Sequence, residues 1–128
     1  MNTAITNGIR ISVTPRYLMD ESKPVEGRHL FSYTIEIENV SDHTVQLMRR
    51  HWYILDSSSH SREVEGDGVI GQQPVLHPGQ IHRYTSWCPL ESDIGLMFGF
   101  YKMRIVDTSA EFEVRIPEFT LCSDAKLN

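Results

Sequence analysis

The chain has 128 residues, of which 40% are hydrophobic and 23% charged, a composition that excludes a disordered or collagen-like protein and supports one domain core. Its net charge of -5 argues against a broad electrostatic contact with nucleic acid or an anionic membrane. The longest uncharged apolar run, residues 95–101, is too short to cross a bilayer, and no secretory signal is visible at the amino terminus. Two isolated cysteines, Cys88 and Cys122, suggest a reducing, cytoplasmic environment.

Alternation between apolar and polar residues dominates the chain. Residues 9–13 and 31–37 alternate as a half-buried antiparallel strand requires, because successive side chains point to opposite faces. Further strands are expected, between turn residues, at 45–56, 62–65, 80–87, 95–106 and 111–116. No segment combines helical spacing with a capping residue. About seven short strands predict an all-β fold, an immunoglobulin- or fibronectin-III-like antiparallel β-sandwich.

Several single features refine this prediction. Trp52 lies in the third strong strand, where sandwiches of this class often bury an indole between the sheets. Cys88 and Cys122 fall at a turn and near the end of the chain, which excludes the antibody-type disulfide across the core, and Cys88 is expected to be a packed thiol. Residues 14–28 are expected to form a long, mobile loop, and residues 122–128 a flexible tail.

Two adjacent arginines interrupt an otherwise apolar strand. In strict alternation Arg50 shares a face with Trp52, and a buried guanidinium is costly unless it is paired. A β-bulge at Arg49-Arg50 would turn both side chains outward. Alternatively, a carboxylate such as Glu63 or Glu65 on a neighbouring strand would pair with Arg50 and make it an anchor for the glycine-rich segment that follows.

That glycine-rich segment has the spacing Gly66-x-Gly68-x-x-Gly71 of the dinucleotide-binding fingerprint. The fingerprint requires a helix after the glycines, and Pro74 and Pro78 make one unfavourable here. A nest of backbone amides for an anion does not need a helix, although three carboxylates flank the loop. The alternative interpretation is structural: the glycines let an edge segment bulge and pass close to neighbouring backbone.

Other chemistry finds little support in the sequence. Asp56, Ser57–Ser59 and His60 supply the residue types of a serine triad, but on a polar turn with no scaffold. None of the histidines pairs at the spacing of a zinc site, and no acidic cluster matches a calcium loop. The sequence leaves open whether His77 and His82 form a cluster in space. His82 is expected to be half-buried. The sequence therefore predicts no catalytic residue, no metal site and no bound cofactor.

A series of motifs in fixed order resembles the ApaG domain over residues 8–121. The motifs are Arg50-His51-Trp52, Glu65-Gly-Asp-Gly-Val-Ile-Gly-Gln-Gln-Pro74, Leu76, Pro78-Gly79, Tyr84-Thr85-Ser86, Cys88-Pro89-Leu90, Gly95-x-Met97-x-Gly99-x-Tyr101-x-Met103 and Ile116-Pro117-x-Phe119-x-Leu121. Trp87 departs from the family, which commonly has glycine there, and the positions held by Phe98 and Phe100 are often polar. These departures add aromatic surface and leave the glycine-rich segment untouched.

The resemblance implies a single ApaG-type domain spanning residues 1–128, with a fibronectin-III-like fold. It also implies a cytoplasmic bacterial protein, linked by name to cobalt and magnesium efflux, and a domain that serves as an interaction module in eukaryotic F-box proteins and in a DNA-polymerase-associated protein. We therefore expect a non-enzymatic module that binds an unknown protein partner, with a homodimer left open. The alternative is a nucleotide- or pyrophosphate-binding protein that uses the loop Gly66, Gly68 and Gly71.

The candidate partner-binding residues are aromatic. Strand 96–106 divides into two rows, and the row that ends in two cations should face solvent; it is Leu96, Phe98, Phe100, Lys102 and Arg104. Because Trp87 ends the preceding strand, we expect it at the same edge, so that Trp87, Phe98 and Phe100 form one exposed patch. The alternative is that loop 14–28 or the carboxy-terminal tail covers these rings.

Overall fold

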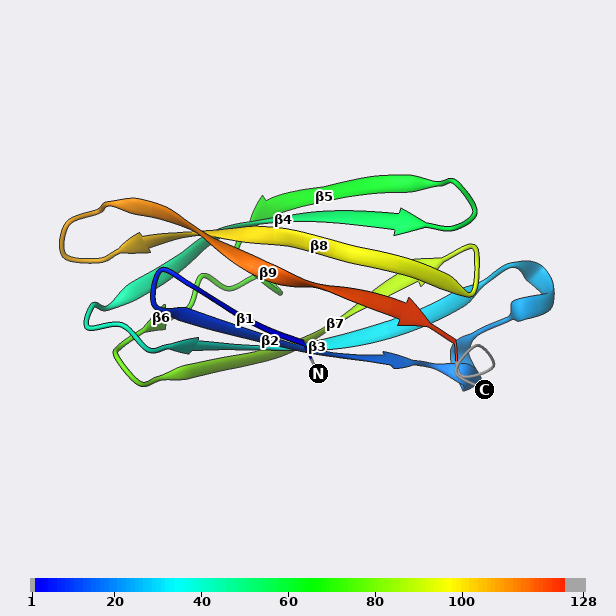
Figure 1. The fold of residues 1–128 in the computed structure, drawn as a ribbon, viewed down its shortest axis with the longest axis horizontal. Coiled ribbons are helices and arrows are strands. Elements are labelled where there is room, and N and C mark those ends of the chain that lie inside the picture. Colours follow the sequence, from blue (N-terminus) through cyan, green and yellow to red (C-terminus); the bar gives the residue numbers. More distant parts are fainter. Residues whose placement is uncertain (1, 124–128) are drawn as a thin grey trace.

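A computed structural model describes residues 2–123 as two antiparallel sheets that face each other (Figure 1). Sheet I has the order β1-β2-β3-β7, and its strands are β1 (Asn2–Thr6), β2 (Ile9–Tyr17), β3 (His29–Asn39) and β7 (Ile81–Leu90). Sheet II has the order β5-β4-β8-β9, with β6 paired to β4; its strands are β4 (Val45–Asp56), β5 (Ser61–Asp67), β6 (Val75–Leu76), β8 (Ile94–Ile105) and β9 (Glu111–Cys122). The predicted all-β sandwich is confirmed.

The core lies between the sheets and consists of the inward rows that the alternation predicted. Ile9, Ile11 and Val13 of β2 are fully buried. Trp52 is 2% exposed, and its ring centroid lies 5.3 Å from that of Tyr33 and 5.9 Å from that of Phe119. Tilted and edge-on ring pairs of this kind stabilise a core beyond their buried area. The prediction of a buried indole between the sheets is confirmed.

The loop expected at residues 14–28 is shorter, because β2 continues through Pro15 to Tyr17. Beyond Val13, β2 has lost its neighbour β1 and pairs with β3 only. Pro15 lies opposite Tyr33. Along this ladder the even-numbered residues of β2 form the hydrogen-bonded pairs with β3, so Pro15 and Tyr33 are a non-hydrogen-bonded pair. The missing N–H of Pro15 therefore removes no ladder bond, and the expectation of a loop from residue 14 was wrong.

The segment that joins β2 to β3 contains two single turns of 3₁₀ helix, η1 (Met19–Glu21) and η2 (Pro24–Glu26). Its backbone is tied to β3, where the Leu18 N–H donates to the Leu30 carbonyl at 2.9 Å. Within residues 2–123, no helix is long and apolar enough to cross a membrane.

The two ends of the described chain are more ordered than the sequence indicated. The first strand, β1, was not predicted, and β9 continues to Cys122, which was assigned to the tail. Ser123 is buried and donates its N–H to the Asp93 carbonyl at 3.0 Å. The remaining part of the predicted tail, residues 124–128, lies outside the described residues.

The arginine pair combines elements of both predicted solutions. The β4–β8 register shifts between Leu47 and Arg49, so a bulge at this point changes which residues of β4 face the core. Arg49 turns outward and contacts Asp67 at 2.6 Å, whereas Arg50 stays half-buried and donates to the carbonyls of Asp67 and Gly68, both at 3.0 Å. Arg50 thus anchors the glycine-rich loop through backbone carbonyls, and the expectation of a carboxylate partner for it was wrong.

Candidate functional site

The outer face of sheet II carries an apolar surface on its two central strands. Three successive cross-strand pairs of β4 and β8 point away from the core, since they alternate with buried residues such as Trp52 and Met97. These pairs, which together are called the aromatic face below, are Leu55–Leu96, Tyr53–Phe98 and His51–Phe100. Leu96, Phe98 and Phe100 were predicted to face outward; His51, Tyr53 and Leu55 were not singled out.

Four rings of the aromatic face stack into a continuous row. Phe98 lies 5.1 Å from Tyr53, with 13° between the ring planes. Tyr53 lies 4.6 Å from His51 at 20°, and His51 lies 5.2 Å from Phe100 at 28°. Cross-strand aromatic pairs stabilise a sheet and hold each ring in one orientation. The row is therefore an ordered ridge, and the rings are half-buried because they cover one another.

Carboxylates border the aromatic face along β5. Glu65 and Glu63 are in register with His51 and Tyr53. The His51 imidazole lies between them, with Nδ1 at 3.1 Å from a Glu65 oxygen and Nε2 at 3.5 Å from a Glu63 oxygen. Both carboxylates remain more than half exposed, whereas His51 is largely covered. The β5 border is therefore acidic and open to a cationic group from outside.

The opposite border, along β9, is mixed in charge and hollowed. Arg115 is in register with Phe100, and Glu113 with Lys102. A hollow of about 330 Å³ lies between the ring row and this border, and Thr6 of β1 also lines it. A smaller hollow of about 170 Å³ lies on the other side of Phe100. Phe100 therefore stands between two depressions that side chains of another molecule could fill.

Trp87 lies on the other side of the molecule. It belongs to β7 of sheet I, is in register with Ser32 and is 58% exposed. Its neighbour Cys88 points into the core, so the indole points away from it, on the face opposite to Phe98 and Phe100. The expectation that the three aromatics share one patch was wrong. The short connection from β7 to β8 leads from sheet I to sheet II. The outer faces of these two sheets lie on opposite sides of the sandwich, so outward side chains of β7 and β8 point in opposite directions.

The glycine-rich loop closes on itself. The Gly68 N–H donates to the Met48 carbonyl at 2.9 Å, and Val69 and Gln72 exchange backbone hydrogen bonds of 2.8 and 3.0 Å. Gly68 has a φ of 62°, and a Cβ there would lie 2.1 Å from the Gln72 carbonyl oxygen. The close backbone approach supports the structural interpretation of these glycines. Anion binding by Gly66, Gly68 and Gly71 stays a prediction, and the Gly68 amide that it would use already donates to a protein carbonyl.

The residues considered for nucleophilic catalysis form a structural turn. The buried Asp56 carboxylate accepts hydrogen bonds from the Ser58 N–H, the Glu91 N–H and the Ser92 hydroxyl. Burial alone would raise the pKa of Asp56, but these hydrogen bonds outweigh it and lower the pKa below 3.8. His60 contacts Ser58 and Glu91 through the same nitrogen, Nδ1, whereas a triad base uses one nitrogen for each partner.

No group of three or more histidine, cysteine or acidic side chains within residues 2–123 is placed to hold a metal ion. His77 Nδ1 lies 3.1 Å from the Thr44 hydroxyl. His82 is half-buried, as expected, beside Tyr84, and burial lowers its pKa. Cys88 is buried and its thiol pKa is raised to about 11, chiefly by that burial, which confirms a packed thiol.

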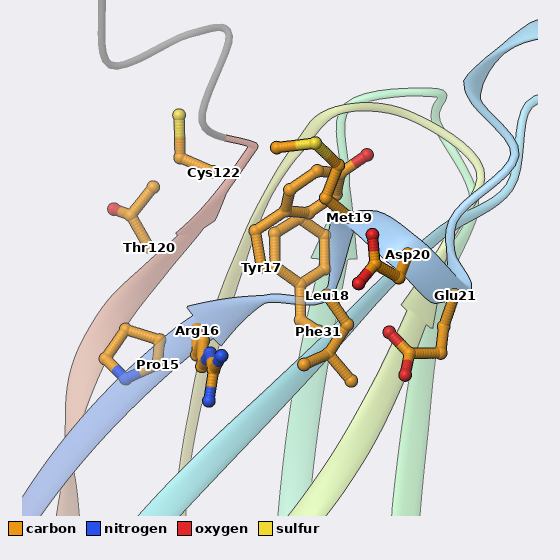
Figure 2. Close-up of a pocket in the computed structure, with 10 residues that line it drawn as sticks. All are labelled: Pro15, Arg16, Tyr17, Leu18, Met19, Asp20, Glu21, Phe31, Thr120 and Cys122. Atoms are coloured by element: carbon orange, nitrogen blue, oxygen red, sulfur yellow. The ribbon is translucent and has the colours of Figure 1, made fainter.

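A further hollow, of about 750 Å³, lies at one end of the sandwich between the ends of β2 and β9 (Figure 2). Figure 2 shows Tyr17 and Phe31 at its centre, with Asp20 and Glu21 on η1 and Cys122 at the end of β9. The Tyr17 hydroxyl lies 3.3 Å from His29 Nδ1. The sequence did not indicate this hollow, because residues 14–28 were expected to be a loop rather than a strand end and a 3₁₀ turn.

Two facing antiparallel sheets with the strand orders β1-β2-β3-β7 and β5-β4-β8-β9 form an immunoglobulin- or fibronectin-III-like β-sandwich. A family model described as the ApaG domain matches residues 19–105, so the chain belongs to the ApaG domain family. Curated relatives named Protein ApaG from Xanthobacter autotrophicus and Brucella canis are 45% and 46% identical over 121 residues, which are 94% of this chain and 92% of each relative. The solved structure of a Bordetella pertussis protein described as ApaA is 43% identical with a TM-score of 0.87, covering 91% of this chain and 94% of that one.

Proposed function

We propose that the chain is a non-enzymatic, cytoplasmic module that binds a protein partner on the aromatic face. The observation that carries the proposal is the run of three outward pairs of aliphatic and aromatic side chains, Leu55–Leu96, Tyr53–Phe98 and His51–Phe100, on the two central strands of one sheet. A central strand pair normally presents polar side chains to water. A contiguous apolar patch with a polar rim is typical of protein interaction sites.

The rim indicates the chemistry of the partner. Glu63 and Glu65 present exposed carboxylates along one side of the ring row. A lysine or arginine that approaches this border would meet two carboxylates, and its aliphatic stem would lie against the rings. Arg115 and Glu113 on the other border offer charges of both signs. We infer a polypeptide partner that places an apolar side chain in the hollow beside Phe100 and a basic one near Glu63 and Glu65.

Removing two rings should abolish capture of this partner. In Phe98→Ser with Phe100→Ser, both ring stacks are lost, at a cost of about 1–2 kcal/mol in the free energy of unfolding because the rings are half-buried. The matched control, Ile5→Ser, removes an exposed apolar side chain from β1 of sheet I. Quantitative mass spectrometry of proteins captured from cell extract should find one protein that binds wild type and Ile5→Ser equally and the double variant at least tenfold less.

The charge of the partner can be tested on the purified pair. Glu63→Lys with Glu65→Lys should slow association several-fold at low ionic strength and less at high ionic strength, because rim charges act mainly on the association rate. A captured protein that binds the Phe98→Ser, Phe100→Ser variant as well as wild type would contradict the proposal. The link of the family to cobalt and magnesium efflux stays a prediction. We propose that the partner, rather than this chain, provides that link.

A further inference from the structure

Strand β7 has an open edge. It is the last strand of sheet I and pairs with β3 alone, so within residues 2–123 no strand pairs with its other side. The Asn39 N–H donates to the Gln80 carbonyl, which places the even-numbered positions of this register in the hydrogen-bonded pairs with β3. The odd-numbered residues of β7 therefore direct their N–H and C=O groups to the open edge.

One end of this edge is blocked and the rest is free. At Pro89 there is no N–H, and Arg62 Nη2 donates to its carbonyl at 2.5 Å. Ile81, Arg83, Thr85 and Trp87 remain, with exposed side chains on the outer face of the sheet. Edge strands usually carry charges, prolines or bulges that prevent pairing, and β5, an edge strand of sheet II, is rich in acidic residues. From residue 81 to residue 87, β7 carries one formal charge, on Arg83, and presents a tryptophan that is 58% exposed.

We propose that a second copy of the chain pairs antiparallel with β7, with Thr85 opposite Thr85 of the second copy on the two-fold axis. In this register Arg83 lies opposite Trp87 of the second copy, in two equivalent pairs. A guanidinium beside an indole is a favourable cation–π contact, and each of the three pairs can exchange two backbone hydrogen bonds. The two four-stranded sheets become one continuous sheet.

The side chains of β7 select this register over its neighbours. An axis at Arg83 would place two guanidinium groups opposite each other. An axis at Trp87 would place Thr85 opposite Pro89, which has no N–H and whose carbonyl is already bonded to Arg62. The axis at Thr85 avoids both and keeps every hydrogen bond within residues 83–87. An axis at Tyr84 would also keep these bonds, but it would place Arg83 opposite Thr85 and lose the contact of Arg83 with Trp87. The edge of β7 is thus self-complementary in the register with Thr85 on the axis.

Sedimentation velocity tests the proposal directly. With rising concentration from about 1 µM to about 500 µM, the wild-type chain should shift from its monomer mass of 14.7 kDa to twice that mass. Trp87→Glu alone should still dimerise, because Arg83 then faces a carboxylate. Arg83→Glu with Trp87→Glu places carboxylates opposite each other and should remain a monomer. A wild-type monomer at the highest concentration, or a dimer of the double variant, would overturn the proposal.

A cross-link tests the register without depending on those variants. Cα atoms in a hydrogen-bonded antiparallel pair are about 5.5 Å apart, within the range that a disulfide spans. Thr85→Cys should therefore form a covalent dimer under mild oxidation, whereas Ile81→Cys and wild type should not. Failure of Thr85→Cys to cross-link would also overturn the proposal. Phe98→Ser with Phe100→Ser should dimerise as wild type does, which separates this inference from the proposed partner site.

Discussion

Replacing Gly99 with alanine should destabilise the protein by about 4 kcal/mol or more, or prevent folding. Gly99 lies in β8 opposite Trp52, where a Cβ would stand 2.0 Å from the His51 carbonyl oxygen and 3.1 Å from the Trp52 Cα. Both are backbone atoms of the central strand β4, so they cannot rotate away as the end of a side chain would. Urea unfolding followed by tryptophan fluorescence and circular dichroism measures the loss.

Gly71→Ala provides the matched comparison. Gly71 has a φ of 71°, but within residues 2–123 no atom other than those of Gly71 and its two chain neighbours lies within 4 Å of the position that its Cβ would occupy. The only cost is the left-handed backbone conformation, about 1 kcal/mol. If Gly71→Ala destabilised the protein as much as Gly99→Ala, the close approach of β4 to β8 would not be the reason for glycine at position 99.

Asp56→Ala should lower the free energy of unfolding by about 3 kcal/mol, the second largest effect expected. The Asp56 carboxylate ends β4 and joins two loops, because it accepts from the Ser58 N–H at 3.2 Å, from the Glu91 N–H at 2.6 Å and from the Ser92 hydroxyl. Alanine leaves these donors without their acceptor at the end of the sandwich. Equilibrium urea unfolding of the variant at pH 7 measures the difference.

The contribution of Asp56 should depend on pH. Its pKa is lower in the folded protein than its ordinary value of 3.8, so the unfolded chain binds the proton more readily. The stabilisation is therefore complete above the ordinary value and is lost as pH falls through the lower folded value. The difference in unfolding free energy between wild type and Asp56→Asn should be constant from pH 5 to pH 7 and should shrink towards pH 3. A difference that stays constant to pH 3 would contradict this role of the carboxylate.

Alternation along single strands predicted most of the sandwich and half of the aromatic face. Phe98 and Phe100 were assigned to the solvent side of their strand because Lys102 and Arg104 share their row. His51 and Tyr53 carry the same signal, since they alternate with Trp52 and Ile54. Their stacking on the phenylalanines depends on the register of β4 against β8, which the sequence of either strand alone does not contain.

The misplacement of Trp87 has a different physical cause. A short connection between two strands usually joins neighbours in one sheet, and on that basis Trp87 was expected beside Phe98. Here residues 91–93 lead from sheet I to sheet II, and the turn is held by Asp56. The face that Trp87 occupies is therefore set by the pairing of β7 with β3, a strand far from it along the chain.

The environments of Arg49 and Arg50 also depend on residues outside their own strand, which limits what the sequence could predict for them. The two guanidinium groups differ in environment because the bulge beside Leu47 changes the phase of β4, and because the Asp67 and Gly68 carbonyls come within reach of Arg50. The sequence indicated both a bulge and a loop anchor as separate solutions. It could not show that Arg49 and Arg50 each adopt a different one, because that depends on the path of the glycine-rich loop.

Site-specific photocross-linking tests the proposed binding face most directly. With a photoreactive phenylalanine analogue at position 100, a chain expressed in its own cells should form a covalent adduct with one defined protein upon irradiation. The same analogue at position 5, on β1 of sheet I, should not form that adduct. Absence of an adduct from position 100, or the same adduct from both positions, would contradict the claim that the aromatic face holds a partner.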